Sequence, residues 1–137
     1  MACFGELDCR HSIGIFRYVK KQGIDDPLPV IQSLTAGYAA RLIGVANERR
    51  LSLMLVTPPT SNINDALLPA ADRRLFRSIE RMFCDGVRDQ AAQHDLRVID
   101  LAAATRASGG AVRRDVYVDA HHILPDVFLE ACAAAKL

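Results

Sequence analysis

The sequence contains no apolar run of the roughly 18 residues that a membrane-spanning helix needs. Its first dozen residues also lack the basic segment, apolar core and cleavage site of a secretory signal peptide. The 17 basic and 16 acidic residues nearly cancel, so no long-range field attracts nucleic acid or an anionic membrane surface. We therefore expect a cytoplasmic protein with no nucleic-acid or membrane partner.

Cysteine is scarce, and no C-x-x-C pair occurs among Cys3, Cys9, Cys84 and Cys132. This irregular spacing favours reduced thiols over a disulfide framework or a zinc site. Imidazole, thiolate and carboxylate groups that could together suit a transition metal occur at Asp8, Cys9, His11, Asp119, His121 and His122. Because none of these groups has the spacing typical of a zinc site, we expect no metal and no other cofactor.

The 137 residues suit one domain, spanning 1–137. Short apolar runs predict strands, and longer segments with apolar residues every three or four positions predict helices. The predicted strands cover residues 2–4, 51–59 and 96–101, and the predicted helices cover 29–49, 69–94 and 125–135. Strands that alternate with helices indicate βαβ units, so we expect an α/β fold with a parallel sheet covered on both faces.

The periodicity also predicts which helix faces turn inward. In helix 29–49 the predicted inner face consists of Ile31, Leu34, Tyr38, Leu42, Val45 and Ala46. In helix 69–94 the predicted inner face consists of Leu75, Ile79, Met82, Phe83, Val87 and Ala91. The polar side of this helix carries Asp72, Arg73, Arg77, Glu80, Arg81 and Arg88. Residues 102–112 contain Gly and Ser and are predicted to form a flexible loop.

Polar segments follow each predicted strand, which is where open parallel sheets bind ligands. These segments are 5–11, 57–64, and Asp100 together with 117–122. In the last of them Asp119 and His122 stand three residues apart, a spacing that lets a carboxylate orient an imidazole and stabilise its cation. A second interpretation is equally open, because such polar clusters also serve only as turns and helix caps.

Two motifs resemble the SGNH, or GDSL-type, hydrolase family. The family's D-x-x-H element is similar to residues 119–122, and GELD (5–8) stands where the family has G-x-N-D. The longer string FGELDCRHSI resembles the F-G-E-[IL]-D-C-R-x-H-I segment of bacterial members. The resemblance implies a three-layer αβα, flavodoxin-like fold with a short, mostly parallel sheet. It also implies hydrolysis of an ester or acyl group, carbohydrate acetyl groups included, in a small-molecule or glycan ester.

The same resemblance assigns roles to individual residues. Catalysis falls to Asp119 and His122, and oxyanion or substrate binding falls to Gly5, Glu6, Asp8 and Arg10. The chain departs from the family at Leu7, which replaces the asparagine that donates to the oxyanion and has no side-chain donor.

The family's nucleophile lies in a G-D-S element that precedes G-x-N-D, and this sequence has none. We therefore expect an N-terminally truncated domain that lacks the first strand and the nucleophile. Ser12 and Ser61 have no G-x-S-x-G or G-D-S context. Cys9 is an alternative nucleophile, because the neighbouring Arg10 and His11 would raise its thiolate fraction.

Loss of the first strand would leave one sheet edge open. We therefore expect a homo-oligomer or a partner chain that completes the sheet. The competing hypothesis follows from this expectation: a non-catalytic SGNH-like module for binding or assembly, which oligomerises through the exposed sheet edge.

Overall fold

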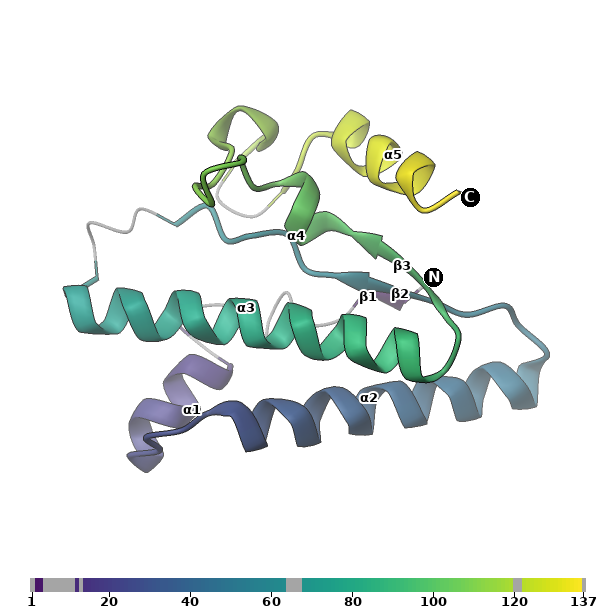
Figure 1. The fold of residues 1–137 in the computed structure, drawn as a ribbon, viewed down its shortest axis with the longest axis horizontal. Coiled ribbons are helices and arrows are strands. Elements are labelled where there is room, and N and C mark those ends of the chain that lie inside the picture. The colour runs from purple at the N-terminus through teal and green to yellow at the C-terminus, as the bar shows by residue number, and fades with distance from the viewer. Residues whose placement is uncertain (1, 4–11, 13, 64–67, 120–121, 137) are drawn as a thin grey trace.

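The computed structural model describes residues 2–3, 12, 14–63, 68–119 and 122–136 (Figure 1). Helices and strands alternate along these ranges. The elements are β1 (Ala2–Cys3), α1 (Ile15–Gln22), α2 (Leu28–Arg49), β2 (Met54–Thr57), α3 (Ala70–Gln93), β3 (Arg97–Asp100), α4 (Leu101–Ala104), a short 3-10 helix (Arg114–Val116) and α5 (Pro125–Ala134). Within the described ranges, none of the helices combines the length and the apolar character that crossing a membrane requires.

The sheet is parallel, with the strands in the order β1-β2-β3. Ala2 lies opposite Leu55, and the register from β2 to β3 runs from Met54 opposite Arg97 to Thr57 opposite Asp100. The central strand is the most apolar because both of its faces are covered. The prediction of a mixed α/β chain with a short parallel sheet is therefore confirmed.

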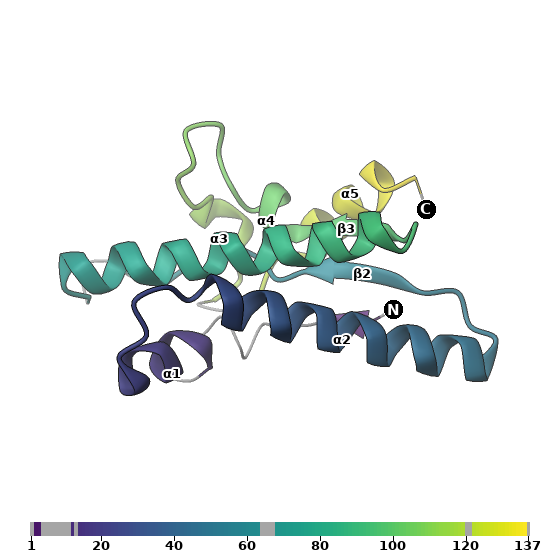
Figure 2. The ribbon, with the colours of Figure 1, turned by 60° about the horizontal axis from the view of Figure 1, so that its bottom comes forward.

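Helices cover both faces of the sheet, with α1, α2 and α3 on one side and α4 and α5 on the other (Figure 1). Turning the molecule brings α2 into view alongside α3 (Figure 2). Successive residues of a strand point to opposite faces. Leu55 accordingly belongs to the core formed with α1, α2 and α3, whereas Val56 belongs to a second core with Ile99, Leu101 and Ala131.

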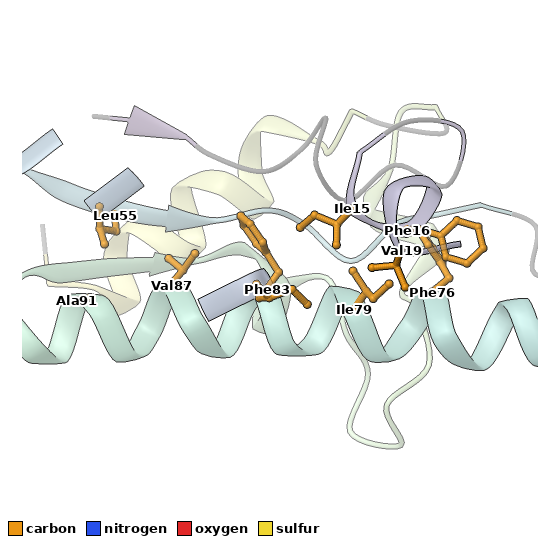
Figure 3. Close-up of a cluster of buried hydrophobic side chains, with 10 residues drawn as sticks. Ile15, Phe16, Val19, Leu55, Phe76, Ile79, Phe83, Val87 and Ala91 are labelled. Carbon is orange, nitrogen blue, oxygen red and sulfur yellow. The ribbon is translucent and has the colours of Figure 1, made fainter. Parts of the chain in front are cut away.

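The larger core lies between α3 and the sheet (Figure 3). Its buried members are Ile15, Phe16, Val19, Ile31, Leu55, Phe76, Ile79, Phe83, Val87 and Ala91. The rings of Phe16 and Phe76 meet edge to face, with 5.6 Å between their centroids. Each large side chain of this kind stabilises the fold by about 1.5–3 kcal/mol when it is fully buried. The inward face predicted for helix 69–94 is confirmed at Ile79, Phe83 and Val87.

Three elements of the described structure were not predicted: α1, α4 and the short 3-10 helix. Helix α1 begins after Gly14 and ends at Gly23, whose φ of 62° is the left-handed conformation that terminates helices. The predicted flexible loop 102–112 is wrong at its start, where α4 begins directly after β3. The Asp100 carboxylate caps α4 by accepting a hydrogen bond from the Ala103 N–H at 3.0 Å.

The predicted inner face of α2 is partly wrong. Val45 is 45% exposed, whereas Thr35 and Ala39 are buried. Small side chains face inward here because α2 packs closely on α3. A Cβ atom added at Gly86 of α3 would lie 2.9 Å from Thr35 Oγ1, closer than such contacts normally are.

This close approach makes Gly86 a sensitive position. We expect Gly86→Ala to lower the free energy of unfolding by about 1 kcal/mol, because overpacking outweighs the gain in helix propensity. The control is Gly44→Ala in α2, where an added Cβ meets no atom within 4 Å. This control should raise stability by about 0.5–1 kcal/mol. Urea unfolding of both variants measures the difference.

A double-mutant cycle identifies the contact that causes the effect. In a Thr35→Ala background, Gly86→Ala should no longer destabilise the protein, because the hydroxyl and methyl groups that it meets are gone. Equal gains in stability from Gly86→Ala and Gly44→Ala in the native background would contradict the close packing of α2 on α3.

Candidate functional site

Thr60, in the loop that follows β2, joins three segments of the chain. Its N–H donates to Thr105 Oγ1 at 2.9 Å, and its hydroxyl donates to the Ala102 carbonyl at 3.2 Å. The Tyr117 hydroxyl donates to the Thr60 carbonyl. The loop is therefore fixed against the end of α4 and against the segment that carries Asp119 and His122.

The structure brings Asp119 and His122 together. His122 Nδ1 lies 2.7 Å from Asp119 Oδ2, and the His122 N–H donates to Asp119 Oδ1 at 2.8 Å. The Val118 N–H donates to the His122 carbonyl at 2.7 Å, and Tyr117 pairs with Ile123 in an antiparallel bridge. One oxygen of Asp119 thus holds the backbone of the turn, and the other contacts the imidazole ring.

The pair is accessible and lies beside the β2 loop. The His122 side chain is 77% exposed and that of Asp119 is 53% exposed. Asn62 Nδ2 donates to the Asp119 carbonyl at 3.4 Å. Because Asp119 occupies Nδ1, the ring can present Nε2 as an acceptor to solvent, and no residue in the described ranges bonds to that nitrogen.

A buried carboxylate from α3 holds the same loop from the other side. Glu80 is only 3% exposed, and its Oε1 accepts the Ser61 N–H at 2.8 Å. Arg77 Nη1 lies 2.7 Å from Glu80 Oε2 and also donates to the Ser61 carbonyl at 2.9 Å. Burial raises the pKa of Glu80, and the Arg77 charge offsets part of that rise.

Glu80 lies on the predicted polar side of α3, yet it is buried. Here the polar side of the helix turns toward the backbone of Ser61, so charged side chains meet polar groups of the protein itself. Periodicity distinguishes polar faces from apolar faces, but it does not distinguish solvent from a polar loop. The spacing of Arg77 and Glu80, three residues apart, was the signal in the sequence that indicated an ion pair.

Asp100 braces the ends of two strands. Arg88 donates to it twice, from Nε to Oδ2 at 2.9 Å and from Nη2 to Oδ1 at 3.0 Å. The Thr57 hydroxyl donates to Oδ1 at 2.9 Å, and the Ala103 N–H donates to the same oxygen at 3.0 Å. Burial acts to raise the pKa of Asp100, but these hydrogen bonds together lower it. The geometry thus gives Asp100 a bracing role.

Cys84 is buried on α3, and its Sγ lies 3.9 Å from the Pro58 carbonyl oxygen. Burial raises the pKa of this thiol to about 12. Because the thiolate is the nucleophilic form of cysteine, Cys84 is a poor nucleophile in the folded protein.

Several predicted site residues lie outside the described residues. These are Gly5, Glu6, Asp8, Cys9, Arg10, His11 and His121. The described part of the chain contains no group of three or more His, Cys, Asp or Glu residues that could hold a metal ion. The described part of the candidate site therefore consists of the β2 loop, α3 and residues 117–119 and 122–123.

Comparisons with protein-family models, with curated proteins and with solved structures gave no match. The resemblance of FGELDCRHSI and of residues 119–122 to the SGNH family therefore stays a prediction.

The bracing role of Asp100 can be tested through stability. We expect Asp100→Asn to cost about 1–3 kcal/mol, because charge-assisted bonds from Arg88 are lost. The lowered pKa sets the pH dependence: stabilisation by the carboxylate is complete above its unfolded pKa of about 3.9 and is lost as pH falls through its lower folded pKa. The stability difference from wild type should therefore shrink below about pH 4 in urea titrations.

A matched control for this experiment is Asp89→Asn, which changes an exposed carboxylate on the same helix as Arg88. We expect it to alter the free energy of unfolding by less than about 0.5 kcal/mol at every pH. If Asp100→Asn behaved like this control, the bracing role would be wrong.

The burial of Cys84 predicts its reactivity. In native protein at pH 8, we expect iodoacetamide to label Cys84 at least about 100-fold more slowly than the partly exposed Cys132. Mass spectrometry of tryptic peptides measures both rates. In urea the two rates should converge, and fast labelling of Cys84 in the native state would contradict its burial.

Proposed function

We propose that the chain is an SGNH-type hydrolase of esters or acyl groups, or a fragment of one, in which Asp119 and His122 form the supporting acid/base pair. The observation that carries the proposal is the distance of 2.7 Å between His122 Nδ1 and Asp119 Oδ2 in an exposed turn. The loop after β2 contacts this turn, as expected for a site at the carboxyl end of a parallel sheet. Helices on both faces of the sheet support a three-layer fold of the SGNH kind.

The chemistry follows from the orientation of the ring. An ionised Asp119 accepts a hydrogen bond from Nδ1–H, so Nε2 is free to take the proton of an attacking hydroxyl. The oxygen then bonds to the ester carbonyl carbon, and the resulting imidazolium returns its proton to the leaving alkoxide. Water repeats these steps on the acyl-enzyme and releases the acid. The Asp119 carboxylate stabilises the imidazolium throughout.

The remaining roles in this proposal come from the family resemblance. Gly5, Glu6, Asp8 and Arg10 bind the oxyanion or the substrate, which is a small-molecule or glycan ester. They follow β1, whose Cys3 lies opposite Val56 of β2 in the register. The nucleophile is a serine that this sequence does not identify, and Cys9, which lies outside the described residues, is the alternative nucleophile.

A second candidate is a non-catalytic module that assembles through its sheet. One observation favours it: β1 pairs with β2 on one side, and no described strand pairs with its other side. Such an edge can accept a strand from a second copy or from a partner chain. This candidate predicts a stable oligomer, measured by light scattering during gel filtration, together with no ester turnover.

Hydrolysis of p-nitrophenyl acetate tests the leading proposal. We expect His122→Ala to lower kcat/KM by about 10²-fold or more, the usual contribution of a general base. Asp119→Asn should also lower it, because the amide keeps an oxygen acceptor for the turn but removes the charge that stabilises the imidazolium. Circular dichroism checks that each variant is folded.

The control is His94→Ala, which removes an exposed imidazole at the end of α3. An imidazole group by itself hydrolyses activated esters, so His94→Ala measures this background reaction. Turnover that falls in His122→Ala but not in His94→Ala therefore comes from the site. Turnover that survives His122→Ala would overturn the acid/base pair. Turnover abolished by Cys9→Ala would replace the serine mechanism with a thiol mechanism.

A further inference from the structure

A pocket of about 360 Å³ lies beside the Glu80 carboxylate. Three segments form it: α3, the loop after β2 and the loop after α4. Its lining residues are Thr60, Arg77, Glu80, Arg81, Arg106, Gly110, Ala111 and Val112. This volume is near the lower end of the range for small-molecule sites.

The pocket carries excess positive charge. Its lining has three arginines and one carboxylate, and both oxygens of that carboxylate are already bound, by Arg77 and by the Ser61 N–H. The side chain of Arg106 makes one hydrogen bond with the described residues, a long one of 3.4 Å from Nη2 to Thr60 Oγ1. Arg81 is exposed and makes no hydrogen bond or ion pair with a described residue. Among the described residues, neither of these two guanidinium groups therefore forms an ion pair with a carboxylate, although the charge of Arg106 acts on Glu80 from a distance and opposes the rise in its pKa that burial causes.

Backbone contacts hold Arg106 at this position. Arg106 pairs with Val112 in an antiparallel bridge, and the Ala107 N–H donates to the Ala111 carbonyl at 2.8 Å. The Gly110 N–H donates to the Ala107 carbonyl at 2.8 Å, which closes the turn. The rim of the pocket is thus formed before any ligand arrives, and preorganisation lowers the entropic cost of binding.

The pocket also adjoins the acid/base pair through one short loop. Thr60 lines the pocket and accepts from the Tyr117 hydroxyl, and Asn62, two residues later, donates to the Asp119 carbonyl. A molecule that occupies the pocket therefore lies against the same loop to which the segment carrying Asp119 and His122 is bonded.

We propose that this pocket binds an oxyanion, a carboxylate or phosphate group, through the guanidinium groups of Arg81 and Arg106. Arginine suits this ligand because its planar donors match two oxygens at once. The substrate of the enzyme is then an ester that also carries an anionic group. This second step rests on the proposed hydrolase function, whereas the binding site itself does not.

Calorimetric titration tests the site without any ester, with inorganic phosphate and succinate as separate probes. We expect saturable binding of at least one probe to native protein, and its identity distinguishes a phosphate site from a carboxylate site. Arg106→Gln and Arg81→Gln should each weaken that binding about tenfold, because each removes one charge from the pocket. Arg81 makes no hydrogen bond or ion pair with the part of the chain that the structure describes, so its variant tests the site even where Arg106→Gln perturbs the loop.

The matched control is Arg49→Gln, which removes the same charge from the exposed end of α2. It should leave the affinity within about twofold of wild type. Equal affinity in all three variants, or no saturable binding of either probe, would overturn the proposed site.

Ester kinetics test the link to the substrate. We expect the ratio of kcat/KM for the mono-p-nitrophenyl ester of succinate to that for p-nitrophenyl acetate to fall about tenfold in Arg106→Gln. An unchanged ratio would overturn the substrate class. Absence of turnover with both esters would overturn the hydrolase proposal, and the calorimetric result would still decide the binding site.

Discussion

The buried carboxylate of Glu80 is the contact on which the candidate site depends. It fixes the backbone of Ser61, and through that loop it sets the positions of the pocket and of the turn that carries Asp119 and His122. A buried carboxylate is costly unless charged and hydrogen-bonded partners compensate it. Here Arg77 and the Ser61 N–H supply that compensation, so the ion pair determines the conformation of the loop more than it adds net stability.

The parallel direction of the strands explains why so many polar residues meet at one end of the sheet, where the strands have their carboxyl ends. The strand ends at Thr57 and Asp100 lie in register, and at this end of the sheet β2 leads into a loop and β3 leads into α4. Arg88 and Thr57 hold the Asp100 carboxylate, so this part of the edge is rigid. The exposed imidazole and the pocket rich in arginine therefore lie on a rigid support, which is the arrangement that binding and catalysis require.

The regular elements were largely predictable because each follows from local periodicity. The long helices and all three strands were predicted within a few residues of their observed bounds, and Asp119 with His122 was predicted as a pair. Helix α1 was missed because it spans only eight residues between two glycines. The inner face of α2 was misjudged at Val45, because the closeness of α3 selects small residues such as Ala39 for the interface.

The alternation of helices and strands and the spacing that lets Asp119 reach His122 were predictable, because they depend on residues close together in the chain. The burial of Glu80, the bracing role of Asp100 and the pocket shared by Arg81 and Arg106 follow only from the folded arrangement. Those outcomes depend on contacts between segments far apart in the chain. The sequence pattern of a charged residue is the same whether its side chain contacts water or a backbone amide. Which of the two it contacts depends on how distant segments of the chain pack together.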